Sequence, residues 1–208
     1  MFSGIIEATG KVKKVEALDQ AFRIFVQRPI DFDDLRIGDS VANDGVCLTV
    51  EKFDQDSIVF TLGLETLKIL GRKKTTDWEN RVLNLERSLR FGDRVHGHLV
   101  TGHVETMGKI VKSQYEGESL LLSVSIPENM HSYCWKKGSL TINGVSLTIN
   151  ELSGEQNKTV EVCLIPETVK RTNLGLLKVG EEVTLEPDYM ARAVLHGIKS
   201  GAIEVPHV

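Results

Sequence analysis

Cys47 and Ser146 occupy the same position in two copies of one short motif, which reads Gly-Val-Cys-Leu-Thr at 45–49 and Gly-Val-Ser-Leu-Thr at 144–148. In an extended strand, the thiol or hydroxyl points to the same face as the threonine two positions later. Such a face can supply a nucleophile and a hydrogen bond to a ligand, because a nearby base activates a thiol or a hydroxyl. A small residue packed inside a β-barrel is the alternative that the motif alone leaves open.

The histidines are the second group of candidate reactive residues. Three of the six, His96, His98 and His103, lie close together between the two motifs. An imidazole changes charge near neutral pH, so this segment is a candidate for proton transfer or for hydrogen bonding to a polar ligand. Metal binding is disfavoured, because no cysteine or carboxylate completes a recognisable ligand set. Purely structural histidines are the remaining alternative.

The three cysteines, Cys47, Cys134 and Cys163, are an odd number and lack the spacing of a zinc site. The sequence therefore predicts neither a disulfide framework nor a structural metal, and a reducing compartment suits it. We find no signal-peptide pattern, and no apolar run approaches the roughly 18 residues of a membrane span. We expect a soluble, cytoplasmic protein.

These residues lie within a tandem repeat of about 100 residues. Further landmarks recur in the same order in both halves of the chain: Gly4 and Gly102, Glu7 and Glu105, Gly10 and Gly108, Lys11 and Lys109, Gly38 and Gly138, Glu65-Thr66 and Glu167-Thr168, and Leu85-Glu86 and Leu185-Glu186. Retention of Glu-Thr suggests that each copy uses this corner. The duplication predicts an N-terminal domain over 1–97, a C-terminal domain over 98–187, and a helix with a tail over 188–208.

Each repeat is rich in short segments of Val, Ile, Leu, Phe and Thr, separated by Gly-Asp, Asp-Gly and Asn-Gly turns. These segments predict strands near 1–12, 22–27, 40–53, 57–62 and 81–87, and again near 99–113, 119–126, 139–152, 158–164 and 181–187. Short antiparallel strands must hide their edges, and closure into a small barrel achieves this. The predicted fold is therefore all-β, with two tandem six-stranded antiparallel Greek-key barrels and a C-terminal α-helix.

Few helices are expected. The segments 31–35 and 128–135 follow prolines at corresponding places and predict one short helix in each repeat. In the segment 188–199, Asp188 can cap a helix, and apolar residues such as Met190 and Val194 fall at helical spacing. An appended amphipathic helix of this kind is a candidate oligomer contact, with packing on its own barrel as the alternative.

Composition narrows the function classes. A hydrophobic fraction of 41% over 208 residues is normal for a protein with a packed core, and the formal net charge is −4. A module that binds single-stranded nucleic acid needs a basic groove with stacking aromatics, and the aromatic content is only 6%. The one basic cluster, Arg72-Lys73-Lys74, is interpreted as a solvated turn.

Five motifs occur in the same order as in a known family: MFSGIIE (1–7), GVCLTV (45–50), GHLVTGHV (97–104), INGVSLT (142–148) and LIPET (164–168). On these motifs the chain resembles riboflavin synthase over its whole length. Members of that family have two similar six-stranded barrels and a C-terminal helix through which three subunits associate. The resemblance therefore implies a homotrimer built on a lumazine-binding repeat, with lumazine synthase as a further candidate partner.

The resemblance also implies a transferase reaction, the last step of riboflavin biosynthesis. Two molecules of 6,7-dimethyl-8-ribityllumazine exchange a four-carbon unit and give riboflavin and 5-amino-6-(D-ribitylamino)uracil. Each barrel binds one lumazine, and the reacting pair meets where the N-terminal barrel of one subunit faces the C-terminal barrel of another. No metal or organic cofactor is implied, because the ring is already electrophilic and its 7-methyl group is acidic.

Carried over position by position, the resemblance implies a catalytic role for five residues: Cys47, Ser146, Thr148, His103 and Asp188. Ser146 or Cys47 would add to the methyl-bearing ring carbon or direct a water to it. His103 would assist proton removal, with His98 as the second candidate for this role. Asp188 has two competing roles, the helix cap and a hydrogen bond to Ser146, and the second is favoured.

Groups from both repeats would hold the pyrimidine ring and the ribityl hydroxyls, with Phe2 as a wall of the site. The implied substrate-binding residues of the first repeat are Phe2, Gly4, Ile5, Ile6, Leu48, Thr49, Thr61, Gly63, Glu65 and Thr66. Those further along the chain are His98, Gly102, Val104, Lys137, Leu147, Cys163, Ile165, Pro166, Glu167 and Thr168.

Departures from the family pattern fall mainly in the first repeat, at Asn43-Asp44, Leu64, 68–78 and His96, and they put the contacts of the N-terminal pocket in question. A non-catalytic lumazine- or flavin-binding protein on the same scaffold, like the fluorescent accessory proteins of luminous bacteria, is the main alternative. Such carriers lose much of the second reactive pocket. The presence of the whole catalytic set named above therefore favours the enzyme.

Overall fold

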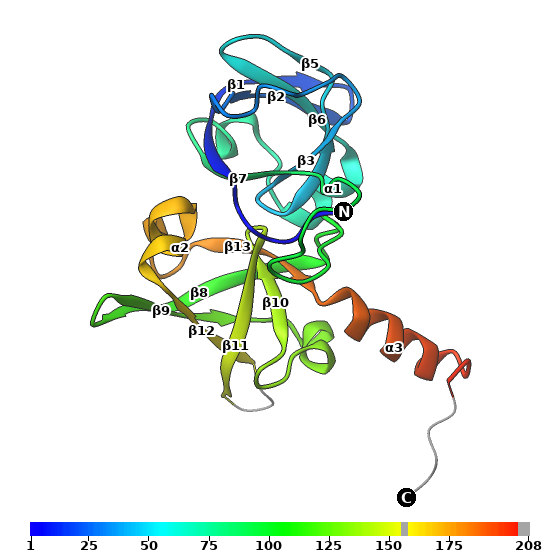
Figure 1. The fold of residues 1–208 in the computed structure, drawn as a ribbon, viewed down its shortest axis with the longest axis vertical. Coiled ribbons are helices and arrows are strands. Elements are labelled where there is room, and N and C mark those ends of the chain that lie inside the picture. The colour runs from blue at the N-terminus through cyan, green and yellow to red at the C-terminus, as the bar shows by residue number, and fades with distance from the viewer. Residues whose placement is uncertain (155–157, 204–208) are drawn as a thin grey trace, which may run out of the picture.

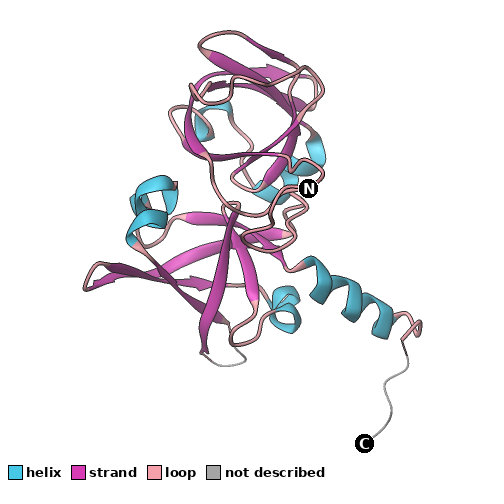
Figure 2. Cartoon of the chain, in the orientation of Figure 1, coloured by secondary structure: helices cyan, strands magenta, loops and turns pink. Residues whose placement is uncertain are grey.

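The computed structural model describes residues 1–154 and 158–203. The chain forms two β-rich domains that lie one above the other in Figure 1, and a C-terminal helix extends away from the lower domain. Figure 2 shows strands curling around the centre of each domain, with the helices at the periphery. The predicted all-β class with two tandem domains and a C-terminal helix is confirmed.

The N-terminal domain is a seven-stranded antiparallel sheet with the strand order β4-β3-β7-β1-β2-β6-β5. Its strands are β1 (Ala8–Leu18), β2 (Ala21–Gln27), β3 (Ser40–Asn43), β4 (Val46–Thr49), β5 (Lys52–Phe53), β6 (Ser57–Leu62) and β7 (Val82–Arg87). The strand predicted at 1–12 begins only at Ala8, because the first residues of the chain pair with the second half of the molecule.

The C-terminal domain is a closed barrel with the strand order β10-β11-β12-β9-β8-β13. Its strands are β8 (Thr106–Glu116), β9 (Ser119–Ser125), β10 (Ser139–Ile142), β11 (Val145–Ser153), β12 (Thr159–Leu164) and β13 (Glu182–Pro187). The period of two in the sequence decides which side chains enter the barrel. In β12, for example, Val160, Val162 and Leu164 are buried and alternate with partly exposed residues.

The two domains differ in closure at one strand. The second copy has a continuous strand, β11, that pairs with β10 on one side and β12 on the other. Its counterpart in the first copy is divided into β4 and the short β5. The interruption falls at Val50 and Glu51, whose N–H groups donate to the carbonyls of Asp39 (2.8 Å) and Val59 (3.0 Å). Beyond β5, the Asp54 carboxylate turns the chain into β6 by accepting hydrogen bonds from the backbone N–H groups of Asp56 (2.8 Å) and Ser57 (2.7 Å). The first copy is therefore a curled sheet rather than the closed six-stranded barrel that the sequence predicted.

Each domain has its own hydrophobic core. Side chains such as Ile24 and Phe60 fill the first, and side chains such as Leu122 and Val162 fill the second. Complete burial of a side chain of this size contributes about 1.5–3 kcal/mol to folding. A small third cluster joins both halves of the chain and consists of Phe2, Ala42 and Val100, with Cys47 packed against it.

Two short helices begin where the sequence predicted only corners. α1 (Leu64–Leu70) contains Glu65-Thr66, and α2 (Pro166–Arg171) contains Glu167-Thr168. Pro166 takes the first helical position, where its missing N–H needs no partner. The Glu-Thr pair that both copies retain therefore lies in the first turn of a helix in each domain, where a carboxylate is electrostatically favourable.

The helix predicted at 31–35 is wrong. These residues form turns around Phe32, which is fully buried. The Phe32 carbonyl accepts hydrogen bonds from Arg28 Nε (3.0 Å) and Nη2 (2.7 Å), so the arginine takes the place of a helical partner. The corresponding prediction at 128–135 is closer, because a 3-10 helix, η2 (Glu128–Tyr133), forms there. Two further 3-10 helices are η1 (Thr75–Asp77) and η4 (Asn173–Leu176).

Arg72 is not solvated, although the basic cluster Arg72-Lys73-Lys74 was expected to form a solvated turn. Its side chain is buried, and its guanidinium lies 5.1 Å from the ring centre of Trp78, a cation–π contact. Burial lowers the pKa of Arg72 to about 10. The neighbouring Lys73 and Lys74 are exposed, so the solvated interpretation holds for the two lysines only.

The C-terminal helix α3 (Tyr189–Lys199) extends away from the body of the protein (Figure 1). Its exposed side chains include Tyr189, Met190, Val194 and Ile198, which are apolar for most of their surface. This exposure leaves an uncovered apolar stripe on the helix. In the part of the chain that the structure describes, no helix combines the length and hydropathy of a membrane span.

Candidate active site

Two short segments, 2–4 and 100–102, meet between the domains. The Phe2 N–H donates to the Val100 carbonyl (2.8 Å), and the Val100 N–H donates to the Phe2 carbonyl (3.0 Å). Both side chains are buried. The two segments are equivalent in the repeat, so this pairing marks a local two-fold relation between the copies.

The segments 2–4 and 100–102 are called the crossing segments below, and a buried glutamate anchors each of them on its own domain. Glu86, on β7, accepts hydrogen bonds from the N–H (2.7 Å) and Oγ (3.0 Å) of Ser3 and from the N–H of Gly4 (3.0 Å). Glu186, on β13, makes the same three contacts with 101–102, at 2.7, 2.6 and 3.0 Å. Burial raises the pKa of Glu86 to about 7. The sequence marked both glutamates as repeat landmarks but gave them no role.

Each crossing segment also contacts the strand of the other domain that carries Ser146 or Cys47. The Gly4 carbonyl accepts from the Ser146 N–H (2.8 Å), and the Gly102 carbonyl accepts from the Cys47 N–H (2.9 Å). Only glycine fits at these two positions, because an added Cβ would lie 2.6 Å from Ser146 Cβ or 2.5 Å from Cys47 Cβ. Both glycines also have positive φ, +73° and +79°. The start of the chain thus completes the C-terminal site, and 102–104 complete the N-terminal one.

The N-terminal site contains a cavity of about 230 Å³ beside α1. Six of its lining residues were predicted from the sequence: Cys47, Glu65, Thr66, Gly102, His103 and Val104. Val46, Ile69 and Leu70 complete the lining, and two of these were missed because the sequence analysis did not predict α1. The cavity therefore combines an apolar wall with a few polar groups, which is the usual composition of a small-molecule site.

The C-terminal site places an imidazole against Ser146. Ser146 Oγ lies 2.7 Å from His98 Nδ1, and His98 Nε2 lies 3.1 Å from Thr141 Oγ1. Burial lowers the pKa of His98, against the opposing charges of Asp188 and Glu186. Thr141 was not predicted, although its place opposite Ser146 in the β10–β11 hairpin follows from the turn at 143–144.

The structure divides the two histidines between the two sites. His98 contacts Ser146, whereas His103 lines the cavity beside Cys47. Asp188 Oδ1 accepts hydrogen bonds from the N–H groups at the start of α3, at 2.7 and 3.3 Å. Within 1–154 and 158–203, Asp188 makes no hydrogen bond to Ser146. Of the two roles considered for Asp188, the structure shows the helix cap.

The other predicted residues flank the two sites or belong to the cores. Buried members are Phe2, Ile6, Leu48 and Leu147, and partly buried members are Thr61, Cys163 and Thr168. Exposed members are Ile5, Thr49, Gly63, Lys137, Thr148, Ile165, Pro166 and Glu167. Thr61 and Cys163 take equivalent places on β6 and β12, and the equivalent pair Thr49 and Thr148 lies on β4 and β11, so the predicted set follows the repeat.

A buried polar network joins the domains near the crossing segments. Asp44 and Asn143 occupy equivalent hairpin turns, and their Oδ1 atoms accept from the N–H groups of Asn84 (2.8 Å) and Thr184 (2.9 Å). Asn173, from η4, donates through Nδ2 to Asp44 Oδ1 (2.8 Å) and through its N–H to Asn84 Oδ1 (2.7 Å). Burial raises the pKa of Asp44. The network fixes the relative position of the two halves that share the sites.

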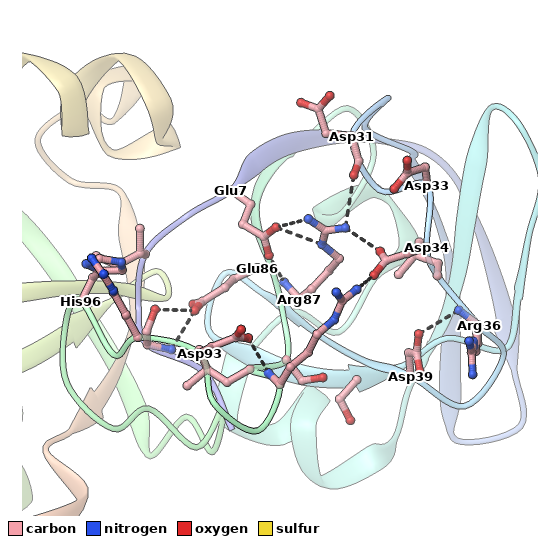
Figure 3. Close-up of a pocket in the computed structure, with 18 residues that line it drawn as sticks. Glu7, Asp31, Asp33, Asp34, Arg36, Asp39, Glu86, Arg87, Asp93 and His96 are labelled. Atoms are coloured by element: carbon pink, nitrogen blue, oxygen red, sulfur yellow. Dashed lines mark hydrogen bonds and ion pairs between the residues drawn. The ribbon is translucent and has the colours of Figure 1, made fainter.

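A larger cavity, of about 1100 Å³, lies on the N-terminal domain beside its crossing segment. Figure 3 shows that charged side chains dominate its lining, with Arg87 bound between Glu7 and Asp34. Ile5 is the one predicted site residue that lines it. Four arginines line this cavity, and two of them, Arg87 and Arg90, form ion pairs with carboxylates of the same lining. We therefore place the candidate site at the smaller cavity and at Ser146.

Known proteins match this arrangement over most of the chain. The family model described as the lumazine binding domain matches twice, at 3–88 and 101–188. A crystal structure of LumP complexed with riboflavin shares the fold, with a TM-score of 0.80 and 24% identity over 90% of this chain and 99% of that one.

Curated relatives are closer in sequence. The riboflavin synthase of Mycobacterium tuberculosis is 38% identical over 200 residues, which cover 93% of this chain and 96% of the relative. The riboflavin synthase of Escherichia coli is 34% identical over 204 residues, 96% of this chain and 92% of the relative. That of Photobacterium phosphoreum is 34% identical over 196 residues, 93% of this chain and 87% of the relative. Two lumazine-binding domains and full-length similarity show that this chain belongs to the riboflavin synthase family.

Proposed function

We propose that this chain converts two molecules of 6,7-dimethyl-8-ribityllumazine into riboflavin and 5-amino-6-(D-ribitylamino)uracil. The observation that carries the proposal is the matched pair of sites. Each domain presents Cys47 or Ser146 on an equivalent strand, and each site is completed by a glycine segment from the other domain. A reaction between two identical substrates needs two similar pockets, and the duplicated domains supply them.

In this reaction the main task of the protein is orientation, which contributes roughly 7–11 kcal/mol at best for well-aligned reactants. We assign one lumazine to the N-terminal domain, 1–97, and one to the C-terminal domain, 98–187. The apolar wall formed by Val46, Ile69 and Leu70 suits the flat ring. Polar groups of both domains would hold the ribityl hydroxyls.

The chemical step requires a nucleophile and proton transfer. Ser146 or Cys47 adds to the methyl-bearing ring carbon or directs a water to it, and Thr148 contacts the lumazine in the C-terminal pocket. His103, in the N-terminal pocket, assists proton removal from the methyl group. Asp188, beside the C-terminal site, supplies charge near His98 while it caps α3.

We infer that three subunits associate through α3, so that pockets of neighbouring subunits face each other. The exposed apolar stripe of the helix supports this, since Met190 is 58% exposed and Val194 is 47% exposed. The predicted contact region, 188–208, includes 204–208, which lie outside the described residues. Val194→Glu should convert the trimer into monomers in light scattering, and a trimer that persists would contradict the assignment.

The decisive experiment is to incubate the purified protein with 6,7-dimethyl-8-ribityllumazine, without added metal or cofactor. Product is followed by absorbance and chromatography, and one riboflavin is expected for two lumazines consumed. Tight binding with a fluorescence change but no riboflavin would overturn the proposal and identify a carrier.

Two variants test the assigned nucleophiles. Ser146→Ala and Cys47→Ser should slow turnover while lumazine binding stays largely intact. Normal turnover in both variants would show that the assignment is wrong.

Two further expectations follow from the resemblance and the composition. The three free cysteines support a reducing, cytoplasmic location, which fractionation of the source cells would test. Association with lumazine synthase stays a prediction, and co-purification of the two proteins would test it.

A further inference from the structure

We propose that His98 is the base that takes the proton of Ser146, and that Thr141 is a positioning residue that fixes the imidazole tautomer needed for this step. The inference rests on the proposed function and deepens it, because it assigns nucleophile and base to the C-terminal site. It also separates the roles of the two histidines, since His103 belongs to the other pocket.

The imidazole of His98 is held at both nitrogens by two hydroxyl groups. Nδ1 lies 2.7 Å from Ser146 Oγ, and Nε2 lies 3.1 Å from Thr141 Oγ1. Thr141 and Ser146 are directly opposite each other in the β10–β11 hairpin, so both side chains leave the same face of the sheet. Thr141 is 1% exposed, so water competes little for its hydroxyl.

The hydrogen bond at one ring nitrogen decides the role of the other. When Thr141 Oγ1 accepts the Nε2 proton, Nδ1 keeps its lone pair and directs it at the Ser146 hydroxyl. The half-buried site favours this neutral ring, because burial lowers the pKa of His98 while the carboxylates of Asp188 and Glu186 raise it less. His98 is therefore in the form that accepts a proton near neutral pH.

The step balances without an external reactant. The Ser146 O–H bond breaks as Oγ bonds to the methyl-bearing ring carbon, and the proton passes to His98 Nδ1. The electron pair displaced from the attacked C=N bond moves into the conjugated pyrimidinedione of the lumazine. When the adduct breaks down, the proton on Nδ1 returns to the leaving Ser146 oxygen.

Two features indicate that this contact is built for the C-terminal site. Gly97 allows the close approach of the loop, because an added Cβ there would lie 2.8 Å from Ser146 Oγ and 2.1 Å from the Ser3 carbonyl oxygen. The first copy has no equivalent of the Thr141 hydroxyl, because Ala42 lies opposite Cys47 and its side chain cannot form a hydrogen bond. The two otherwise similar sites therefore differ in proton chemistry.

Kinetics test the positioning role. Thr141→Val removes the hydroxyl and keeps the branched shape, so we expect kcat to fall roughly tenfold or more while KM changes little. The matched Thr141→Ser variant keeps the hydroxyl and should restore kcat. Thr9→Val, at an exposed position of β1, is the control for a threonine-to-valine change and should leave kcat unchanged. Wild-type kcat in Thr141→Val would overturn the proposal.

Nitrogen-15 NMR of histidine-labelled protein tests the tautomer without turnover, with His98 assigned by its loss in His98→Gln. The expected wild-type spectrum has the proton on Nε2 and a lone pair on Nδ1, and this preference should weaken in Thr141→Val. A proton fixed on Nδ1 in the wild type would overturn the proposal, even if the valine variant does not fold. Absence of riboflavin formation by the wild type would instead overturn the proposed function, so the two failures are distinguishable.

Discussion

Replacement of Glu86 by glutamine should change how the stability of the protein depends on pH. Glu86 is 3% exposed, and burial raises its pKa from 4.5 to about 7. Because the pKa of Glu86 is higher in the folded state than in the unfolded state, the contribution of Glu86 to the free energy of unfolding is fully present below pH 4.5. That contribution is lost as the pH rises through about 7. A glutamine carries no charge at any of these pH values, so Glu86→Gln should lack this loss.

The magnitude follows from the shift between those two pKa values. One pKa unit corresponds to about 1.4 kcal/mol, so the part of the Glu86 titration that falls between pH 5 and 8 lowers the wild-type free energy of unfolding by about 2–3 kcal/mol. Glutamine keeps an acceptor for Ser3, but its amide group faces the N–H of Gly4. The lost contact makes the variant less stable at pH 5 by about 1–3 kcal/mol. This deficit should shrink or reverse by pH 8.

Urea unfolding at pH 5, 6, 7 and 8 measures this difference, followed by the fluorescence of Trp78, which lies in the N-terminal core. At each pH, the difference in free energy of unfolding between the wild type and Glu86→Gln removes the contribution of every titrating group that the two proteins share. Ser3→Ala is the matched control, because it removes the Oγ contact of 3.0 Å and keeps the buried carboxyl group, so its pH slope should remain. Parallel curves for wild type and Glu86→Gln would refute the reasoning.

Three other substitutions test the shared sites and the junction between the domains. Asn173→Ala leaves buried partners of the network without hydrogen bonds and should lower the free energy of unfolding by about 3 kcal/mol, measured in urea; a loss under about 0.5 kcal/mol would contradict the network. Asp44→Asn copies the equivalent Asn143. Because burial raises the pKa of Asp44 above 3.8, its stabilisation is lost as the pH rises, so the variant should gain on the wild type with increasing pH in the same assay. Gly102→Ala places a Cβ 2.5 Å from Cys47 Cβ and should reduce riboflavin formation by roughly tenfold or more, with normal rates arguing against a shared pocket.

The repeat made most of the fold accessible from the sequence. Gly45 and Gly144 mark the same hairpin turn, and both have a φ of +81° in the structure, preceded by Asp44 and Asn143 with a φ of +46°. Such turns fix the register of the strands on either side, and the period of two then decides which side chains face the core. Local chemistry was sufficient here because the turn and the strands agree.

The exchange of segments between the domains was not predictable in this way. Residues 2–4 have the apolar and glycine pattern of a strand, and that pattern is the same whether the strand pairs within its own domain or with 100–102. α1 and α2 were missed for a related reason, since helices this short depend on tertiary contacts rather than on their own propensity.

The same limit applies to the assignment of the histidines. His98 and His103 lie on one segment, and the sequence favoured His103 as the proton acceptor without separating the two pockets that they serve. The structure separates them because the segment passes from the C-terminal site to the N-terminal cavity between these two positions. Thr141 was missed because its role depends on the ring of His98 rather than on a motif of its own.

The exchanged segments explain how one duplicated fold can treat two identical substrates differently. The strands that carry Cys47 and Ser146 are similar, but the residues directly after the crossing segments are not, since His103, which lines the cavity beside Cys47, corresponds in the repeat to Ile5, which lines the larger charged cavity. A dismutation requires this difference, because two identical lumazines must act as donor and acceptor of the four-carbon unit. The buried glutamates couple the halves further: Glu86 belongs to the N-terminal domain, yet it fixes the segment whose carbonyl binds the Ser146 N–H. Each domain therefore fixes the segment that contacts Ser146 or Cys47 of the other domain.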